Sequence, residues 1–332
     1  MPAVQYDVLA IGNAIVDVMR RCDEAFLANL PGPKGHMTLV PSSRAIEEIL
    51  KKLKPGVEVA GGGATNMAVG VGFLGGRAAF IGRVAEDDFG RIFRHDLKSA
   101  GVSFATTSTA VPGKETARSL ILVTPDGRRT MFTFLGCASE IDLGMIDRAI
   151  LDQSRIVFAE GFLMDRIDSA ALLKAVSTAT AAGKRVAVAL SDALCVKRHR
   201  QAFLRLIKSG VAVVFANEAE VKALYETQNV EDAIRQLRGD AQIAVMTRSD
   251  KGSLILTRDD AVSVPAERVE KVVDRTGAGE LYAAGFLYGL SRGLPLAACG
   301  RLGAFAAAEI VQVMGARPQQ RLGHLAKMRG LL

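Results

Sequence analysis

From residue 155 onward, short apolar runs alternate with stretches of helical pattern at intervals of about 25 to 30 residues. Each run is rich in Val, Ile, Ala and Phe, which is typical of parallel strands covered on both faces. Parallel strands need long crossover connections, usually helices. The pattern therefore predicts an α/β fold with a mainly parallel sheet, whose strands lie in RIVFAEGF, KRVAVALSD, VAVVFANEAE and QIAVMTRSD.

Polar residues follow the apolar part of each of these predicted strands. In open parallel sheets, ligands bind beyond the carboxyl ends of the strands. We therefore expect a binding or catalytic site that gathers side chains from these ends. The candidates are Asp192, Asn217, Glu220 and Arg248.

The first half of the chain has a different pattern. SSRAIEEILKKLKPG predicts one amphipathic helix, and the runs ARSLILV and RRTMFTFL flank the turn signal TPDG, which predicts a β-hairpin. Because a hairpin does not fit a series of βα units, we assign it to a small accessory sheet. This sheet comprises residues 13–41 and 106–135 of a single domain, residues 1–332. It either closes over the strand ends as a lid or only covers an edge of the large sheet.

Composition disfavours several kinds of protein. Lys and Arg exceed Asp and Glu by 42 − 35 = 7, but the basic residues are scattered, aromatic residues make up 5% and Trp is absent. We therefore expect no nucleic-acid partner. The four Cys and four His are isolated in the sequence, with no CxxC pair for a metal. The N-terminal segment lacks the features of a signal peptide and its apolar run is too short to span a bilayer, so we expect a cytoplasmic protein with no membrane partner.

GVGFLG, residues 70–75, matches the GxGxxG fingerprint of dinucleotide-binding proteins. However, no strand-like run precedes it, and no acidic residue closes a second strand at the expected distance after it. We interpret its glycines as sites where a helix packs closely on the sheet. The chain also lacks the GxxxxGK[ST] phosphate-binding loop. An NAD(P)-dependent oxidoreductase is therefore disfavoured.

Two further patterns suit a hydroxylated ligand. GGGATN, residues 61–66, combines glycines that allow close backbone approach with an Asn that both donates and accepts hydrogen bonds. Asp17 ends the strand-like VLAIGNAIVD, and its two oxygens can accept two hydroxyl hydrogens. Taken alone, each pattern is also explained by a turn or a helix cap.

DRTGAGE, residues 274–280, places two glycines at the start of a strongly apolar helix pattern. Backbone N–H groups at a helix start lack intrahelical acceptors, and with the helix dipole they bind anions. Dipole complementarity explains an acid at position 280, but it does not explain the glycines on either side of Ala278. If the N–H groups hold a transferring phosphoryl group, Glu280 is a candidate base that takes the proton from the attacking hydroxyl.

Together these motifs resemble the ribokinase/PfkB-like carbohydrate and nucleoside kinases over essentially the whole chain. The resemblance lies in GGGATNMAVGVGFLGGRAAFIGRVAEDDFG and DRTGAGELYAAGFLYGL, with FANEAE, VMTRSDKGSL and VMGARP in the family's order. GNAIVD, TPDGRRTM and FANEAE are most similar to the adenosine kinase branch. The resemblance implies a ribokinase-like three-layer α/β/α sandwich with a β-sheet lid. It also implies transfer of a phosphoryl group from Mg-ATP to the 5′-hydroxyl of a purine nucleoside, adenosine first.

The resemblance further assigns residues to roles. It implies a phosphoryl-transfer site with an anion hole, a base and a lid arginine, formed by Gly277, Ala278, Gly279, Glu280 and Arg129. The residues that would hold the acceptor's hydroxyls and bracket its base are Asp17, Gly62, Gly63, Asn66, Ile15 and Phe162. The residues that would hold Mg²⁺ through water and contact ATP are Asn217, Glu220, Arg248 and Gly252. A monovalent cation such as K⁺ would bind at Asp274 and Gly315.

The chain departs from the family pattern at three positions: Ala85, Arg275 and Glu280. Most of the family has GAGD where this chain has GAGE. Glu and Asp have similar intrinsic pKa values, about 4.3 and 3.9, but the Glu carboxylate reaches about 1 Å further, and such a displacement can reduce a rate by about 10²-fold. Two alternatives therefore stay open beside a nucleoside kinase. They are a ribokinase- or fructokinase-like sugar kinase, and a catalytically impaired binding protein of the same fold, in each case a monomer or a homodimer.

Overall fold

A nine-stranded sheet forms the centre of the computed structural model, which describes residues 4–104, 113–140, 148–165 and 170–332. From edge to edge, its strands are β14 (Ala261–Val264), β13 (Ser253–Thr257), β12 (Ile243–Thr247), β11 (Val213–Asn217), β10 (Arg185–Ala189), β9 (Ser154–Glu160), β1 (Tyr6–Ile11), β5 (Ala78–Ile81) and β6 (Val102–Phe104). The strands from β12 to β6 run parallel, whereas β13 and β14 are antiparallel to their neighbours. The mainly parallel sheet expected from the sequence is confirmed, and the four predicted runs form β9 to β12.

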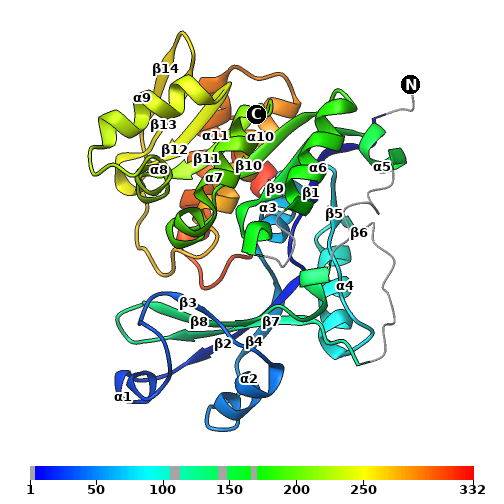
Figure 1. Cartoon of the computed structure of the whole chain (residues 1–332), viewed down its shortest axis with the longest axis vertical. Helices are drawn as coiled ribbons and strands as arrows, with labels where there is room; N and C mark the ends of the chain where they lie inside the picture. Colours follow the sequence, from blue (N-terminus) through cyan, green and yellow to red (C-terminus); the bar gives the residue numbers. More distant parts are fainter. Residues whose placement is uncertain (1–3, 105–112, 141–147, 166–169) are drawn as a thin grey trace.

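Helices cover both faces of this sheet (Figure 1). One face packs against α3 (Gly63–Phe73), α10 (Ala278–Ser291) and α11 (Leu296–Val311), and the other against α6 (Ala170–Ala181), α7 (Ala193–Lys208), α8 (Glu218–Tyr225) and α9 (Val230–Asp240). Successive residues of β1 alternate between the two cores: Val8 and Ala10 lie on the α3 side, and Leu9 and Ile11 on the α6 side. All four are fully buried, which explains the unbroken apolar run. The predicted three-layer sandwich is confirmed.

Three further helices flank these layers: α4 (Asp88–Ser99), α5 (Arg148–Asp152) and α12 (Leu322–Met328). Short 3₁₀ turns follow three of the strands: η1 (Gly136–Glu140), η3 (Gly161–Asp165) and η4 (Ser249–Lys251). The turns η3 and η4 begin directly beyond the carboxyl ends of β9 and β12, where the sequence predicts the site.

A second sheet lies below the first in Figure 1, with the strand order β3 (Met37–Leu39), β8 (Arg129–Phe134), β7 (Ala117–Val123), β2 (Ile15–Arg21) and β4 (Val57–Gly61). β7 and β8 pair antiparallel and form the predicted hairpin. The predicted amphipathic helix is α2 (Ser43–Leu50), which lies beyond this sheet together with α1 (Glu24–Ala28). The small accessory sheet therefore exists in addition to the main sandwich.

The boundaries of the small sheet differ from the predicted ranges 13–41 and 106–135. β4, residues 57–61, also belongs to the small sheet and pairs antiparallel with β2. Its five residues are flanked by Pro55-Gly56 and by further glycines. Such a short run does not show the alternation of apolar and polar residues that indicates a strand. Residues 106–112 of the predicted second range lie outside the described residues.

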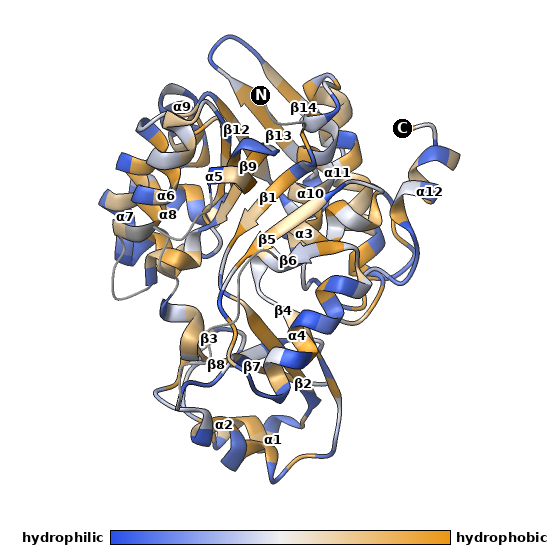
Figure 2. Cartoon of the chain, turned by 90° about the vertical axis from the view of Figure 1, so that its right-hand side faces the viewer, coloured by the Kyte–Doolittle hydropathy of each residue, from blue (hydrophilic) through white to orange (hydrophobic). Residues whose placement is uncertain are grey.

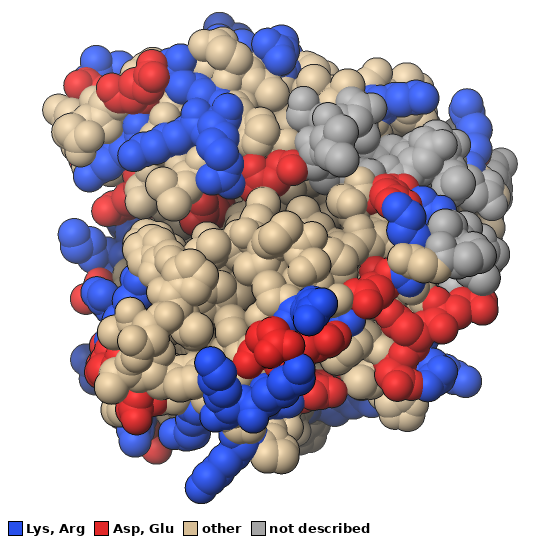
Figure 3. All heavy atoms as spheres, turned by 60° about the horizontal axis from the view of Figure 1, so that its bottom comes forward, with Lys and Arg blue, Asp and Glu red and all other residues tan. Residues whose placement is uncertain are grey.

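Hydrophobic residues concentrate in the strands and on the inner sides of the helices, whereas α2, α4 and α9 carry many hydrophilic residues (Figure 2). On the face in Figure 3, Lys and Arg are interspersed with Asp and Glu around an uncharged area. Within the described ranges, every helix is too short or too polar to cross a lipid bilayer.

Two of the three glycines of GVGFLG, Gly70 and Gly72, serve helix packing, although the closest neighbour of Gly70 is another helix; Gly75 has a φ of 88° and no neighbour within 4 Å of an added Cβ. Gly70 lies in α3, and a Cβ atom there would lie 2.6 Å from Cβ of Ala284 in α10. A Cβ at Gly72 would lie 2.6 Å from the carbonyl oxygen of Ala100. Both distances are shorter than any normal contact, so only glycine allows α3 to pack this closely.

We expect Gly70→Ala to lower the free energy of unfolding by about 1 to 3 kcal/mol, because the added methyl overpacks the contact between α3 and α10. Gly239→Ala is the matched control, since Gly239 lies in α9 and a Cβ there would have no neighbour within 4 Å. That change should raise the free energy of unfolding by about 0.5 to 1 kcal/mol. Urea denaturation of both variants tests the contrast, and equal effects would contradict it.

Candidate active site

The loop before α10 forms a small-residue cradle. Gly277 is the N-cap of α10 and has a positive φ of 77°, and a Cβ there would lie 2.7 Å from Cβ of Ala316. A Cβ at Gly279 would have no neighbour within 4 Å, so this residue faces open space. The N–H groups of Gly279 and Glu280 lie in the first helical turn and have no intrahelical acceptor. The N–H of Ala278 instead donates to the carbonyl of Arg275 at 3.3 Å, so only part of the predicted anion hole is open, and its use stays a prediction.

Glu280 lies at the same helix end, and its side chain reaches across to the start of α3. A Cβ at Gly63 would lie 3.4 Å from Oε1 of Glu280 and 3.0 Å from Oε2 of Glu160. The two carboxylates therefore flank the same glycine. Burial raises the pKa of Glu280, and its own backbone N–H, followed by the Arg129 guanidinium, opposes this rise. A raised pKa suits a general base that works near neutral pH.

Asp274 joins the cradle to two distant segments. Its Oδ1 accepts hydrogen bonds from the backbone N–H and the hydroxyl of Thr276, at 2.9 and 2.6 Å. Its Oδ2 accepts the N–H of Gly315 at 2.9 Å. Nε of Arg129, at the start of β8, lies 3.1 Å from Oδ1. The side chain predicted to contact the phosphates thus lies beside the anion hole, where it forms an ion pair with Asp274.

Arg129 lies beside the predicted monovalent cation site at Asp274 and Gly315, which stays a prediction. Both carboxylate oxygens of Asp274 already accept N–H or O–H donors, and a permanently charged guanidinium occupies the space beside Oδ1. A bound cation would have to compete with Arg129. In the part of the chain that the structure describes, no cluster of three or more His, Cys, Asp or Glu could hold a metal ion.

Asp17 lies in β2 on the small sheet, and its carboxylate packs against Gly61 of β4. A Cβ at Gly61 would lie 2.2 Å from Cγ of Asp17, so glycine is required there. Burial raises the pKa of Asp17 to about 7; Arg317 and Arg129 oppose this rise and Glu280 adds to it. Among the described residues, no hydrogen bond or ion pair occupies this carboxylate. It is therefore available to a ligand.

Four buried polar atoms without a hydrogen-bond partner in the described ranges belong to residues around the β4–α3 junction. They are Oδ1 of Asn13, Oγ1 of Thr65, Oδ1 of Asn66 and Nη1 of Arg317. Arg317 also donates through Nη2 to the carbonyl of Ala60. Buried polar groups are nearly always paired in folded proteins. Unpaired donors and acceptors gathered at one place indicate a site for a polar ligand.

Asn217 and Glu220 form a capping box at the start of α8. Oδ1 of Asn217 accepts the N–H of Glu220 at 2.9 Å, and Oε2 of Glu220 accepts the N–H of Asn217 at 3.0 Å. Burial raises the pKa of Glu220 to about 7, with further contributions from Asp192 and Glu280. The NxxE pattern thus has a structural role in capping the helix. Its predicted role in holding Mg²⁺ through water stays a prediction.

Two cavities meet at the anion hole. The first, of about 350 Å³, is lined by the carboxylates of Glu160, Glu220 and Glu280 and by Arg129. The second, of about 400 Å³, is lined mainly by small and apolar residues of α10, α11 and the 266–272 segment, with Gly252 and Asp250 on its edge. Thr247, Arg275 and Gly279 line both cavities. A ligand with an apolar base at one end and phosphates at the other fits this pair.

The remaining predicted site residues have structural roles or lie outside these two cavities. Phe162 lies in η3 and packs against the core on the α6 side, so its predicted bracket with Ile15 of β2 stays a prediction. Arg248 lines neither of these cavities, and its Nε is buried without a partner in the described ranges. Gly252 has a φ of 80° and tightly approaches the carbonyl of Val264, which explains the glycine structurally. Asp192 caps α7 by accepting the N–H groups of residues 194 and 195.

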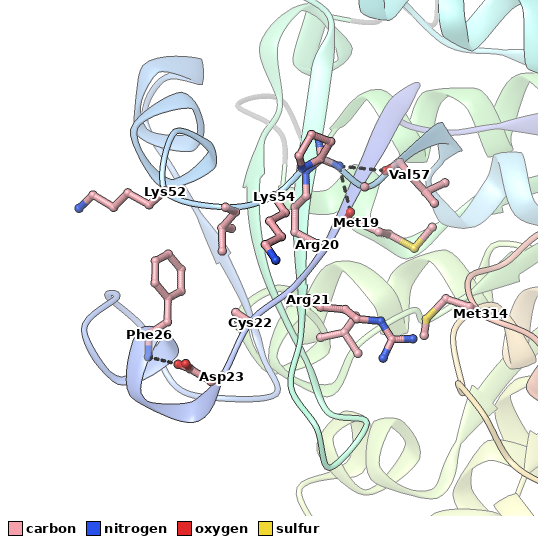
Figure 4. A pocket seen from close by; sticks show the side chains of 14 residues that line it. Met19, Arg20, Arg21, Cys22, Asp23, Phe26, Lys52, Lys54, Val57 and Met314 are labelled. Carbon is pink, nitrogen blue, oxygen red and sulfur yellow. Dashed lines mark hydrogen bonds between the residues drawn. The ribbon is translucent and has the colours of Figure 1, made fainter.

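A larger cavity of about 740 Å³ lies on the small sheet (Figure 4). Its wall includes apolar side chains such as Phe26 and Met19 and the basic residues Arg21, Lys52 and Lys54. Figure 4 shows Arg21 extending toward Met314, which follows α11. None of the residues that the sequence singles out for catalysis lines this cavity.

Sequence reasoning missed two charged residues of the site, Glu160 and Arg317. Glu160 lies in a predicted strand and Arg317 in a family motif, but the sequence patterns assigned no chemistry to either residue. Glu160 follows the apolar part of RIVFAEGF, so the strand-end signal used for Asp192 applied to it equally. Arg317 lies in VMGARP, and nothing in that motif indicates that its charge acts on Asp17. Arg275, noted only as a departure, lines both central cavities.

Comparison with known proteins agrees with this geometry. The profile of the pfkB family carbohydrate kinases matches residues 35–321. The adenosine kinase from Sinorhizobium meliloti superposes with a TM-score of 0.92 at 43% identity, covering 98% of this chain and 100% of that one. A probable sugar kinase from Rhizobium etli CFN 42 superposes with a TM-score of 0.93 at 39% identity, covering 99% and 100%. A cytidine kinase from Thermococcus kodakarensis is 30% identical over 78% of this chain and 90% of its own length.

These relatives carry different acceptor names but share one fold and one type of reaction. The family match spans most of the chain, and the site combines an open helix start with a carboxylate beside it. The chain therefore belongs to the pfkB carbohydrate kinase family, and it is a nucleoside or sugar kinase.

Proposed function

We propose that this kinase transfers the γ-phosphoryl group of ATP to the 5′-hydroxyl of a purine nucleoside, adenosine first. The observation that supports this acceptor class is the group of unpaired polar atoms at the β4–α3 junction, together with the free carboxylate of Asp17. A ribose presents adjacent hydroxyls that both donate and accept hydrogen bonds. The unpaired atoms of the protein also include both donors and acceptors, so the hydroxyls of one ribose can form hydrogen bonds with them.

The position of Glu280 supports its role as the base. Its carboxylate lies between the cradle of α10 and the start of α3, so an acceptor held by Asp17 and Asn66 would present its primary hydroxyl toward Glu280. Burial raises the affinity of Glu280 for a proton. The longer side chain of Glu, compared with the usual Asp, still points into the site. We therefore favour an active kinase over a protein that only binds its ligands.

The cavities support ATP and Mg²⁺ as cofactors. The apolar cavity between α10 and α11 would hold the adenine, and the N–H groups of Gly279 and Glu280 would hold the transferring phosphoryl group. Glu220 and Asn217 lie on the wall of the adjoining cavity and would organise Mg²⁺. When bound, Mg-ATP supplies the phosphoryl group and offsets its negative charge. Arg129 and Arg275 line the same cavity and would bind phosphate oxygens.

The acceptor is tested by a panel assay. Purified protein with Mg-ATP should release ADP on addition of adenosine, with a kcat/KM higher than for cytidine, ribose or fructose. The similarity to an adenosine kinase at 43% identity motivates this order. A clear preference for ribose or fructose would replace the nucleoside proposal by a sugar kinase. Tight calorimetric binding without any turnover would favour the binding protein instead.

For the base, we expect Glu280→Gln to lower kcat by about 10² to 10⁴-fold, because the amide cannot accept the hydroxyl proton. Binding of a non-hydrolysable ATP analogue should be retained, because Gln keeps the backbone N–H that is proposed to hold the phosphoryl group. Coupled ADP assays and calorimetry measure the two quantities. An unchanged kcat would show that Glu280 only complements the helix dipole.

For the acceptor site, we expect Asp17→Asn to raise the KM of the acceptor by at least about tenfold, because a charged hydrogen-bond acceptor is lost. The same change should raise the stability of the ligand-free protein at pH 8. The folded pKa of Asp17, about 7, lies above its ordinary value of 3.8, so stability is lost progressively as the pH rises from about 4 to about 7 and stays lost above that. The advantage of the variant should disappear below about pH 4. Thermal unfolding at both pH values measures this, and a less stable variant at pH 8 would contradict it.

A further inference from the structure

Glu160 ends β9 with a carboxylate that accepts two backbone hydrogen bonds. Its Oε1 accepts the N–H of Asn13 at 2.7 Å, and its Oε2 accepts the N–H of Ala64 at 2.7 Å. The side chain is 2% exposed. Hydrogen bonds from N–H groups to a carboxylate are roughly twice as strong as those between neutral groups. Both bonds therefore hold their backbone segments firmly.

The two N–H groups belong to the two segments by which the early chain crosses between the sheets. Asn13 lies between β1 of the large sheet and β2 of the small sheet. Ala64 lies in the first turn of α3, directly after β4 of the small sheet. One side chain of the large sheet thus fixes the position where the chain enters the small sheet and the position where it returns.

Two glycines beside Glu160 keep space open for its carboxylate. A Cβ at Gly12 would lie 2.9 Å from Cδ of Glu160, and a Cβ at Gly63 would lie 3.0 Å from its Oε2. Either side chain would displace the carboxylate. The conformation is therefore built into the backbone on both sides, and rotation of Glu160 to another position would leave two buried N–H groups without acceptors.

A purely structural role does not explain a negative charge at this place. Burial raises the pKa of Glu160 to about 7, the two N–H bonds oppose this rise, and Glu280 adds to it. A buried carboxylate beside the candidate base costs stability, and its presence is understandable if its position serves the reaction. The same crossovers carry Asp17 and Asn66, which lie four and two residues beyond Asn13 and Ala64. Any shift of these segments moves the acceptor relative to Glu280.

We propose that Glu160 is a positioning residue that fixes both crossovers and thereby sets the distance between the acceptor hydroxyl and the base. This inference rests on the proposed acceptor site, since it assigns Glu160 to the same reaction. It predicts that loss of one of the two hydrogen bonds weakens acceptor use and leaves nucleotide binding intact.

The test compares Glu160→Gln with Asp7→Asn. Gln keeps the size of the side chain but has only one acceptor oxygen, so one N–H group loses its partner. Asp7 is a matched control, because it is also 2% exposed and accepts a backbone N–H, from Arg77 at 2.8 Å. It lies near the amino end of β1, whereas Asn13 follows the carboxyl end of this strand. We expect kcat/KM for the acceptor to fall at least about tenfold in Glu160→Gln, because small displacements at a reacting centre reduce rates strongly. It should change less than about twofold in Asp7→Asn, and the affinity for a non-hydrolysable ATP analogue should be retained in both.

Hydrogen exchange gives a readout that does not depend on turnover. In the ligand-free protein, Glu160→Gln should speed exchange in peptides that contain Asn13 and Ala64, whereas Asp7→Asn should leave them unchanged. If the wild-type protein turns over no acceptor, the proposed function fails, and this exchange contrast still decides whether Glu160 holds the crossovers. Acceptor kinetics of Glu160→Gln that match those of wild type, equal losses in both variants, or unchanged exchange would each overturn the inference.

Discussion

The carboxylate of Asp274 joins three parts of the molecule that are far apart in the sequence. It accepts hydrogen bonds from Thr276 at the helix start and from Gly315 after α11, and it pairs with Arg129 of the small sheet. The start of α10, the loop after α11 and the β7–β8 hairpin therefore share one anchor. With this carboxylate 4% exposed, these contacts are shielded from water and correspondingly strong. The arrangement of the site depends on this anchor.

Four other carboxyl groups of the candidate site have raised pKa values. Glu160, Glu220 and Asp17 each have a pKa raised to about 7, chiefly by burial, and Glu280 is shifted in the same direction. Such a group of carboxylates destabilises the folded chain in neutral solution. The presence of these carboxylates is understandable if a phosphoryl group, its metal ion and a hydroxylated acceptor bind at the candidate site. Perturbed carboxylates in a cavity are typical of catalytic sites.

The Glu at position 280 illustrates how the tertiary structure resolves a question that the sequence raises. An extra methylene moves the carboxylate, and from the sequence alone this change is as compatible with lost chemistry as with altered geometry. In the fold, the side chain spans the gap between α10 and Gly63 and ends beside Glu160. The carboxylate therefore stays within the site, in an environment that raises its pKa. Position and environment, rather than the residue type, decide whether it can act.

The sequence by itself determined the parallel sheet, the hairpin and the start of α10, because these features depend on local periodicity and on glycines at fixed positions. The three-layer arrangement followed from the family resemblance. The family motifs also identified Glu280, Asp17 and Arg129 as candidates. Only the tertiary structure placed β4 in the small sheet, paired Arg129 with Asp274 and brought Arg317 and Glu160 to the site. These contacts join residues more than 90 positions apart, apart from the pairing of β4 with β2. Their formation depends on how the two sheets pack, and no local pattern in the chain encodes that packing.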